Sequence, residues 1–405
     1  MLKQKALYLL IGFLCLPIIA LSQSTNEDDL LYRKFRVSFV PGLSTNGVNA
    51  PQYDAKYSLN ILVGYNGGLS GYELGLVNIN RTYARGVQIG AANISGDESA
   101  GVQFSGLATV SGTDMQGIQI SGLSNFAGGS MQGVQLSGWM NYGNDLQGIQ
   151  IAGLANISRS DMQGLQSAGL ANISSGSAQG IQTAGLMNIS GEFQGISGAG
   201  LLNLSREMQG IQYGSVNVTE RGQGIQIGVI NLASEFEGLP VGLISYYGDG
   251  RKNLDTWISD GGFTHFGINL GTKHIYNMVS VGYNPLISDR DVWTFGWSIG
   301  SYRTLDDAWN RRNLANYFST HDFSFHRIFD DGWSRAQNML YSYRYLLGIN
   351  FSNGALYAGP SANLLVSEQP GNSDYTWYSL FKRTGSDRDV RFWIGASAGF
   401  RLFNQ

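Results

Sequence analysis

The chain is poor in cysteine, in charge and in long hydrophobic runs. Its 405 residues include one cysteine, Cys15, and only 14% are Asp, Glu, Lys or Arg. The formal net charge is −3 and no basic stripe is present, so nucleic acid is not expected as a partner. Beyond residue 22 no apolar run approaches the ~20 residues that a membrane-spanning helix needs. Any insertion into lipid would therefore have to use a β-barrel.

Residues 1–22 have the features of a secretory signal peptide. Two lysines precede an apolar run, and the small residues Ala20 and Ser22 form a cleavage pattern at its end. Cys15 lies inside this segment. In a lipoprotein signal a small residue would precede that cysteine, but Leu14 stands there. We therefore expect an exported mature chain that is not held by disulfides.

A short motif recurs about twelve times between Gly71 and Gly250, at intervals of 14 to 16 residues. The copy that starts at Gly148 reads GIQIAGLANIS and is followed by the linker RSDMQ. Each unit is rich in β-branched residues, lacks a helical period and is too short for two helices. The repeat predicts a β-solenoid in which every unit is one coil stacked on its neighbours. Twelve coils at a strand spacing of ~4.8 Å would extend for about 55 Å.

Two amide positions recur in the repeat, a Gln in the third place and an Asn farther on. A ligand-binding row is one interpretation. The other interpretation is a structural ladder, in which each amide hydrogen-bonds to the same amide one coil above and below. A ladder better explains why the amides recur at nearly every coil. The predicted Gln column consists of Gln88, Gln103, Gln119, Gln135, Gln150, Gln166, Gln182, Gln212 and Gln226. The predicted Asn column consists of Asn78, Asn93, Asn125, Asn141, Asn156, Asn172, Asn188, Asn203, Asn217 and Asn231.

Charged residues of the repeats are confined to the linkers. From Gly86 to Glu237 all ten acidic and three basic residues lie between the consensus cores. We therefore expect the linker to be the solvated corner of each coil and core residues such as Ile151 to be buried, so that Ile151→Asp would be strongly destabilising. Alternatively, each repeat could be one strand of a membrane barrel. The Gln-to-Asn spacing varies between five and six residues, however, which would flip the faces of such a strand.

The segments on either side of the repeats alternate between apolar and small or polar residues. We count about two such strands in residues 23–70, among them 57–65, and about seven in residues 251–405. In 293–299 and 341–351 the aromatic residues share one face. The pattern predicts a C-terminal antiparallel β-domain joined by the N-terminal strands. It could be an outer-membrane barrel with its aromatic face toward lipid, or a soluble domain that caps the solenoid.

The repeat elements GVQIG-x-x-N and GIQIAGLANIS, together with an N-terminal VSFVPGLSTNG, resemble a family of bacterial surface-repeat proteins of unknown activity. The resemblance covers roughly residues 35–250 and is specific in its Gly, Gln and Asn positions. It implies export and surface display, and it supplies no catalytic residues to carry over. Residues 251–405 lie outside it.

Motifs that carry chemistry are missing from the sequence. It contains no phosphate loop, nucleophile elbow or zinc motif, and we predict no catalytic, cofactor-binding or metal-binding residues. The four histidines lie outside the repeats. His321 and His326 would fall on opposite faces of a strand, so we do not expect them to form a metal pair.

The resulting organisation is all-β. It comprises a signal peptide (1–22), N-terminal strands (23–70), a repeat β-solenoid (71–250) and an antiparallel β-domain (251–405). We expect an exported, non-catalytic repeat protein of the outer membrane or cell surface of a Gram-negative bacterium, with the periplasm as the alternative. Its role would be structural or adhesive, toward an unidentified protein or glycan. The other hypotheses are an outer-membrane barrel with a transport or anchoring role, and a carbohydrate-active β-helix.

Overall fold

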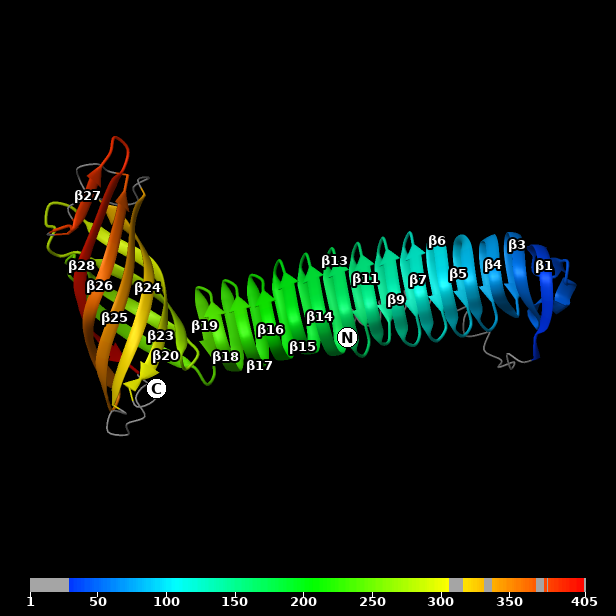
Figure 1. Ribbon diagram of the computed structural model, residues 1–405, viewed down its shortest axis with the longest axis horizontal. Helices are drawn as coiled ribbons and strands as arrows, with labels where there is room; N and C mark the ends of the chain where they lie inside the picture. Colours follow the sequence, from blue (N-terminus) through cyan, green and yellow to red (C-terminus); the bar gives the residue numbers. More distant parts are fainter. Residues whose placement is uncertain (1–28, 306–315, 331–336, 369–374, 377, 404–405) are drawn as a thin grey trace, which may run out of the picture. The chain divides into compact units, whose positions relative to one another are not determined.

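The computed structural model describes residues 29–305, 316–330, 337–368, 375–376 and 378–403. The predicted signal peptide lies outside these residues. The fold is all-β, as predicted: a β-solenoid of about 13 turns and an eight-stranded antiparallel barrel (Figure 1). The chain divides into two compact units, Met1–Ser205 and Arg206–Gln405, which we describe in turn.

The first unit contains the larger part of the solenoid. Successive turns pair in parallel and in register, so that Gly148 lies between Gly133 of one turn and Gly164 of the next. Its elements are β1 (Leu31–Val40), β2 (Leu43–Ser44), the 3-10 helix η3 (Gly47–Gln52), β3 (Tyr53–Asn66), β4 (Gly68–Asn80), β5 (Ala84–Ser95), β6 (Ser99–Ser111), β7 (Met115–Ser121), β8 (Ser124–Ala127), β9 (Met131–Ser137), β10 (Met140–Gly143), β11 (Leu146–Ala152), β12 (Ala155–Ser158), β13 (Met162–Ala168), β14 (Ala171–Ala184) and β15 (Met187–Ala199). Strand β16 (Leu202–Tyr213) follows.

The first glycine of each repeat is required by the close stacking of the turns. Gly148 has a φ of 142°, a conformation that side-chain-bearing residues rarely adopt. A Cβ atom at this position would also lie 2.0 Å from the carbonyl oxygen of Gly133 in the neighbouring turn. Only glycine satisfies both conditions, which explains why this residue begins the repeat.

The interior of the solenoid is polar, and this corrects the expected burial of Ile151. Gln150 is fully buried, whereas its neighbours Ile149 and Ile151 point outward and are 39% and 45% exposed. Successive residues of a strand face opposite sides, so turning the Gln column inward turns the adjacent aliphatic residues outward. The remaining interior positions are filled mainly by small residues and by side chains such as Leu146 and Met162.

The N-terminal strands belong to the solenoid. This corrects the prediction that they join the C-terminal β-domain. β1 and β3 pair in parallel with each other, and β3 pairs in parallel with β4. The alternation in 57–65 has the polarity of the repeats, because Ser58 and Asn60 face inward while Leu59 is exposed. Asn60 already takes part in the amide network, since its Nδ2 donates to Asn78 Oδ1 at 2.9 Å.

The second unit holds the last solenoid strands, β17 (Val216–Ile227), β18 (Ile230–Val241) and β19 (Ile244–Tyr247), followed by the barrel. Neighbouring barrel strands are antiparallel, and pairing of β20 with β28 closes the barrel. Its strands are β20 (Arg251–Ser259), β21 (Thr264–Gly271), β22 (Ile275–Tyr283), β23 (Val292–Thr304), β24 (Tyr317–Asp330), β25 (Asn338–Phe351), β26 (Gly354–Ser367) and β28 (Asp389–Leu402). The short strand β27 (Phe381–Thr384) pairs with β28.

The inward Gln column should contribute more to stability than the outward aliphatic column. Gln150→Met keeps the size of the side chain but leaves Gln135 Oε1 without the hydrogen bond that Gln150 donates at 2.7 Å. We expect a loss of ~1–3 kcal/mol for this unsatisfied buried acceptor. Ile151→Thr should be close to neutral, because the next turn already carries Ser167 at that position. Thermal unfolding of the two full-length variants, followed by circular dichroism, checks this. Equal shifts in midpoint would contradict the assigned inner face.

Candidate functional site in the barrel

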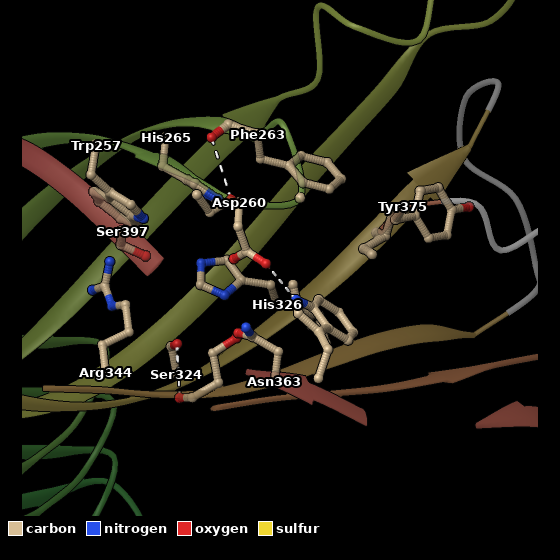
Figure 2. A pocket seen from close by; sticks show the side chains of 16 residues that line it. Trp257, Asp260, Phe263, His265, Ser324, His326, Arg344, Asn363, Tyr375 and Ser397 are labelled. Atoms are coloured by element: carbon tan, nitrogen blue, oxygen red, sulfur yellow. Dashed lines mark hydrogen bonds between the residues drawn. The ribbon is translucent and has the colours of Figure 1, made fainter. Parts of the chain in front are cut away.

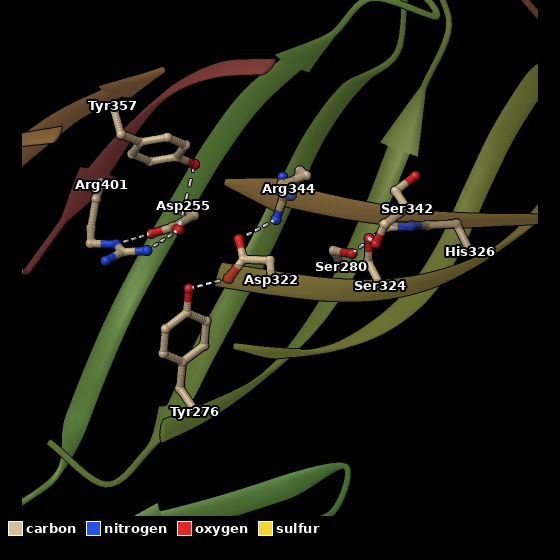
Figure 3. Close-up of polar contacts among 10 residues, drawn as sticks. All are labelled: Asp255, Tyr276, Ser280, Asp322, Ser324, His326, Ser342, Arg344, Tyr357 and Arg401. Atoms are coloured by element: carbon tan, nitrogen blue, oxygen red, sulfur yellow. Dashed lines mark hydrogen bonds and ion pairs between the residues drawn. The ribbon is translucent and has the colours of Figure 1, made fainter. Parts of the chain in front are cut away.

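Charged side chains form pairs inside the barrel, each between neighbouring strands. Arg401 on β28 forms a two-pronged ion pair with Asp255 on β20, with Nε–Oδ1 and Nη2–Oδ2 distances of 2.8 Å each (Figure 3). Arg344 on β25 donates from Nη2 to Asp322 Oδ2 on β24 at 2.9 Å. The Tyr276 hydroxyl donates to the other oxygen of Asp322. None of these four charged residues is more than 4% exposed, so each charge depends on its partner.

Another part of the lumen surrounds a small cavity, shown in Figure 2. His265, His326, Asp260 and Trp393 are among the side chains that line it. Trp393 Nε1 donates to Asp260 Oδ2 at 2.6 Å, and His326 Nε2 lies 3.0 Å from the Ser280 hydroxyl. The free space is about 20 Å³, which is room for about one water molecule. Side chains therefore fill the lumen at this level.

The outer wall of the barrel is apolar and aromatic. On β25, Tyr343 and Tyr345 are 44% and 36% exposed, while the intervening Arg344 is buried. Trp293, Trp297 and Tyr341, which we expected on the same face, are partly exposed. Other strongly exposed apolar residues of the barrel strands are Ile258, Phe266, Ile268, Val281, Tyr283, Phe295, Phe323, Leu347, Ile349, Phe351, Leu356, Leu364 and Ile394.

The predicted ladder residues all lie inside the solenoid, each at most 2% exposed. Gln side chains donate toward the N-terminus: Gln150 Nε2 to Gln135 Oε1 at 2.7 Å, and Gln166 Nε2 to Gln150 Oε1 at 2.8 Å. Asn side chains donate in the opposite direction, for example Asn156 Nδ2 to Asn172 Oδ1 at 2.9 Å. Most of these amides therefore bond to one another, but Ser197 interrupts the Gln column, and Gln182 Oε1 has no hydrogen-bond partner among the described residues.

The Gln column ends on a carboxylate that sequence reasoning missed. Glu73 lies opposite Gln88 in the pairing of β4 with β5 and is 2% exposed. Its Oε2 accepts hydrogen bonds from Gln88 and Asn80, both at 2.8 Å. Its Oε1 accepts from Asn60 at 2.8 Å and Asn66 at 2.7 Å. The sequence carried a signal for this role, because Glu73 stands two residues after Gly71, where the repeats have Gln.

Arg36 occupies the same inward column at the start of the solenoid, since it pairs with Ser58 of β3. It is 2% exposed, and none of its three guanidinium nitrogens has a hydrogen-bond partner among the described residues. Burial lowers the pKa of Arg36, and the nearby Glu73 carboxylate partly opposes that shift. The first turns thus hold two opposite buried charges where later turns hold amides.

Different residues terminate the two columns at the other end, within the second unit. The Tyr247 hydroxyl donates to Gln226 Oε1 at 3.0 Å, and burial raises the pKa of this phenol. Asn231 Nδ2 donates to the Ser245 hydroxyl at 3.3 Å. Asn277 on barrel strand β22 donates to the same hydroxyl at 3.0 Å. The last amide of each column therefore has a hydrogen-bond partner of another residue type.

His321 and His326 lie on opposite faces of β24, as the strand alternation indicated, while His265 and His326 lie together in the lumen with ring centroids 5.1 Å apart. His321 is exposed, with its Nδ1 2.7 Å from the Tyr343 hydroxyl, whereas His326 is buried in the lumen. Within the described residues no group of three or more His, Cys, Asp or Glu side chains could hold a metal ion. The same residues include no helix with the length and apolar character needed to cross a bilayer.

Neither a family model, nor a curated protein, nor a solved structure matches this chain. The resemblance to surface-repeat proteins therefore rests on the Gly, Gln and Asn positions of the repeat. What the structure establishes is the solenoid architecture of these repeats and the barrel that follows them. Function has to be inferred from the geometry.

Removing one member of the Arg401–Asp255 pair should destabilise the barrel more than removing both. Arg401→Met leaves the Asp255 carboxylate buried without its cation, and we expect a loss of ~3–5 kcal/mol. The double variant Asp255→Leu/Arg401→Met removes both charges and should recover most of that loss. Thermal unfolding of the single and double variants, followed by circular dichroism, measures both effects. If the double variant is no more stable than Arg401→Met, the loss does not come from leaving the Asp255 carboxylate unpaired.

Proposed function

We propose that the barrel is embedded in the outer membrane of a Gram-negative bacterium and anchors the solenoid, which is displayed as a non-catalytic structural or adhesive surface. The observation that carries this proposal is the inverted polarity of the barrel. Its charged pairs lie inside, among buried aromatic residues such as Trp257 and Tyr276, while its exposed outer wall is aliphatic and aromatic. Membrane barrels have this arrangement, because hydrocarbon surrounds them while polar groups gather in the lumen.

The length of five of the eight barrel strands supports insertion into a bilayer. Strand β23 has 13 residues, and β24, β25, β26 and β28 have 14 each, whereas β20, β21 and β22 have 9, 8 and 9. A tilted strand needs only ~9–11 residues to cross the hydrocarbon core. The remaining residues can extend into the interfacial regions, where tyrosine and tryptophan are favoured.

The filled lumen favours anchoring over transport. The Arg401–Asp255 and Arg344–Asp322 pairs occupy the barrel interior, and the cavity beside His326 has room for about one water molecule. An eight-stranded barrel is just wide enough for its own side chains to fill it. Transport of a solute would require these ion pairs to break and move aside.

A non-catalytic role for the solenoid is supported by where its polar groups lie. The buried amides bond to one another, and the charged residues between Gly86 and Glu237 lie in the linkers. A carbohydrate-active β-helix would need carboxylates or bases clustered on one face. The signal-peptide features of residues 1–22 and the resemblance of the repeats support export and surface display.

Membrane insertion predicts that a charge on the outer wall of the barrel disturbs assembly. Phe323, 44% exposed, lies at the middle of β24, and Phe323→Arg should cost ~2–4 kcal/mol at the bilayer centre. Leu154→Arg is the matched control, because Leu154 is 45% exposed on the solenoid. We expect less of the Phe323→Arg chain in the carbonate-washed membrane fraction and less of the compact band on unheated gels. The control should behave as the wild type.

The wild-type protein provides the decisive outcome. Retention in the membrane after a carbonate wash, with release only by detergent, is expected of an inserted barrel. If the chain is released by carbonate and remains monomeric in buffer without detergent, the barrel is a soluble domain and the anchoring proposal is wrong.

A further inference from the structure

The outer side of the solenoid in the first unit carries an apolar face that has no partner within the described chain. Its central column runs through eight successive turns, from β1 to β11. Six of its residues are 40–53% exposed: Val37, Leu59, Leu74, Ile89, Phe104 and Ile151. We call this column and the strand surface around it the N-terminal apolar face. Contiguous exposed apolar surface of this kind marks an interaction site.

The fold itself does not require this face to be apolar. In the next three turns the same column continues as Ser167, Thr183 and Gly198. The buried Gln ladder continues beneath Ser167 and Thr183, with Gln182 Nε2 donating to Gln166 Oε1 at 2.9 Å. Small and polar residues are therefore compatible with the same coil. The stacking of the coil therefore does not account for the apolar side chains of the first eight turns.

We infer that the N-terminal apolar face is a self-association surface, which docks onto the same face of a second copy of the chain. Eight turns at ~4.8 Å and five strand residues at ~3.3 Å give a face of ~38 Å by ~17 Å, or about 650 Å² per copy. Two copies would bury ~1,300 Å², which lies within the range of stable specific complexes. Two sheets with aliphatic outer faces can stack ~10 Å apart and interdigitate their side chains.

The residues that carry the face have no net charge that would draw it to an anionic lipid surface. From Leu31 to Ala152 the chain has six acidic and six basic residues. Interfacial binding to anionic lipid is strengthened by an excess of Lys and Arg, which this part of the chain lacks. Between two copies the apolar faces can meet while the linkers stay in solvent. This inference does not depend on membrane insertion of the barrel.

The near-absence of cysteine makes the face directly testable by cross-linking. In a Cys15→Ser background, Ile89→Cys places a thiol near the middle of the face, and Asp97→Cys places one on the exposed linker of the same turn. With detergent-solubilised full-length protein at micromolar concentration, mild oxidation should convert Ile89→Cys to a disulfide-linked dimer. Thr183→Cys, in the polar continuation of the column, and Asp97→Cys should remain monomeric.

Light scattering of cysteine-free protein supplies the second measurement. The protein should have twice the chain mass, and Ile89→Asp should raise the dimer dissociation constant ~10-fold or more. Its melting temperature should stay near that of the parent, because Ile89 is 46% exposed. A monomeric parent, equal cross-linking of the three cysteine variants, or a dimer insensitive to Ile89→Asp would overturn the inference. So would an Ile89→Cys thiol that becomes protected only on addition of phosphatidylglycerol vesicles, since lipid would then be the occupant.

Discussion

The structure depends on hydrogen bonds between identical side-chain amides in neighbouring turns of the solenoid. A buried amide is costly unless its donors and acceptor are satisfied, and in a stacked coil the nearest suitable partner is the same amide one turn away. Gln150 meets this condition by donating to Gln135 and accepting from Gln166. The condition holds only if turns stack in parallel and in register. Repeat length may vary in the linkers, but the amides themselves must coincide.

This constraint also explains the unusual outer surface. Because the amides face inward, the strand pleat turns Ile149 and Ile151 outward, and the solenoid encloses polar groups while it exposes aliphatic ones. The barrel has the same polarity for a different reason, since its Arg401–Asp255 pair lies within and residues such as Phe323 lie without. Both parts of the chain therefore present apolar surface, which in our proposals is covered by lipid around the barrel and by a second copy on the solenoid.

The sequence predicted the two β architectures and the amide columns, but it misassigned the inner face of the solenoid. Alternation with period two shows that two sides of a strand differ, yet it does not say which one is inside. Confinement of charge to the linkers suggested that Ile151 was buried, whereas the Gln repeated at nearly every turn was the better guide. The N-terminal strands were misplaced for the same reason. The pairing of Asp255 with Arg401, 146 residues away, leaves no local pattern in a single sequence.

The first and last amides of each ladder need hydrogen-bond partners of another kind. A column of amides all pointing one way leaves an unsatisfied donor at one end and an unsatisfied acceptor at the other. The carboxylate of Glu73 takes the terminal donor of Gln88, and the hydroxyl of Tyr247 supplies the terminal acceptor Gln226 with a donor. Asn277 of the barrel meets the last turn at Ser245. At each end of the Gln column a residue of another type therefore replaces the amide, so that the last donor and the last acceptor both have a partner.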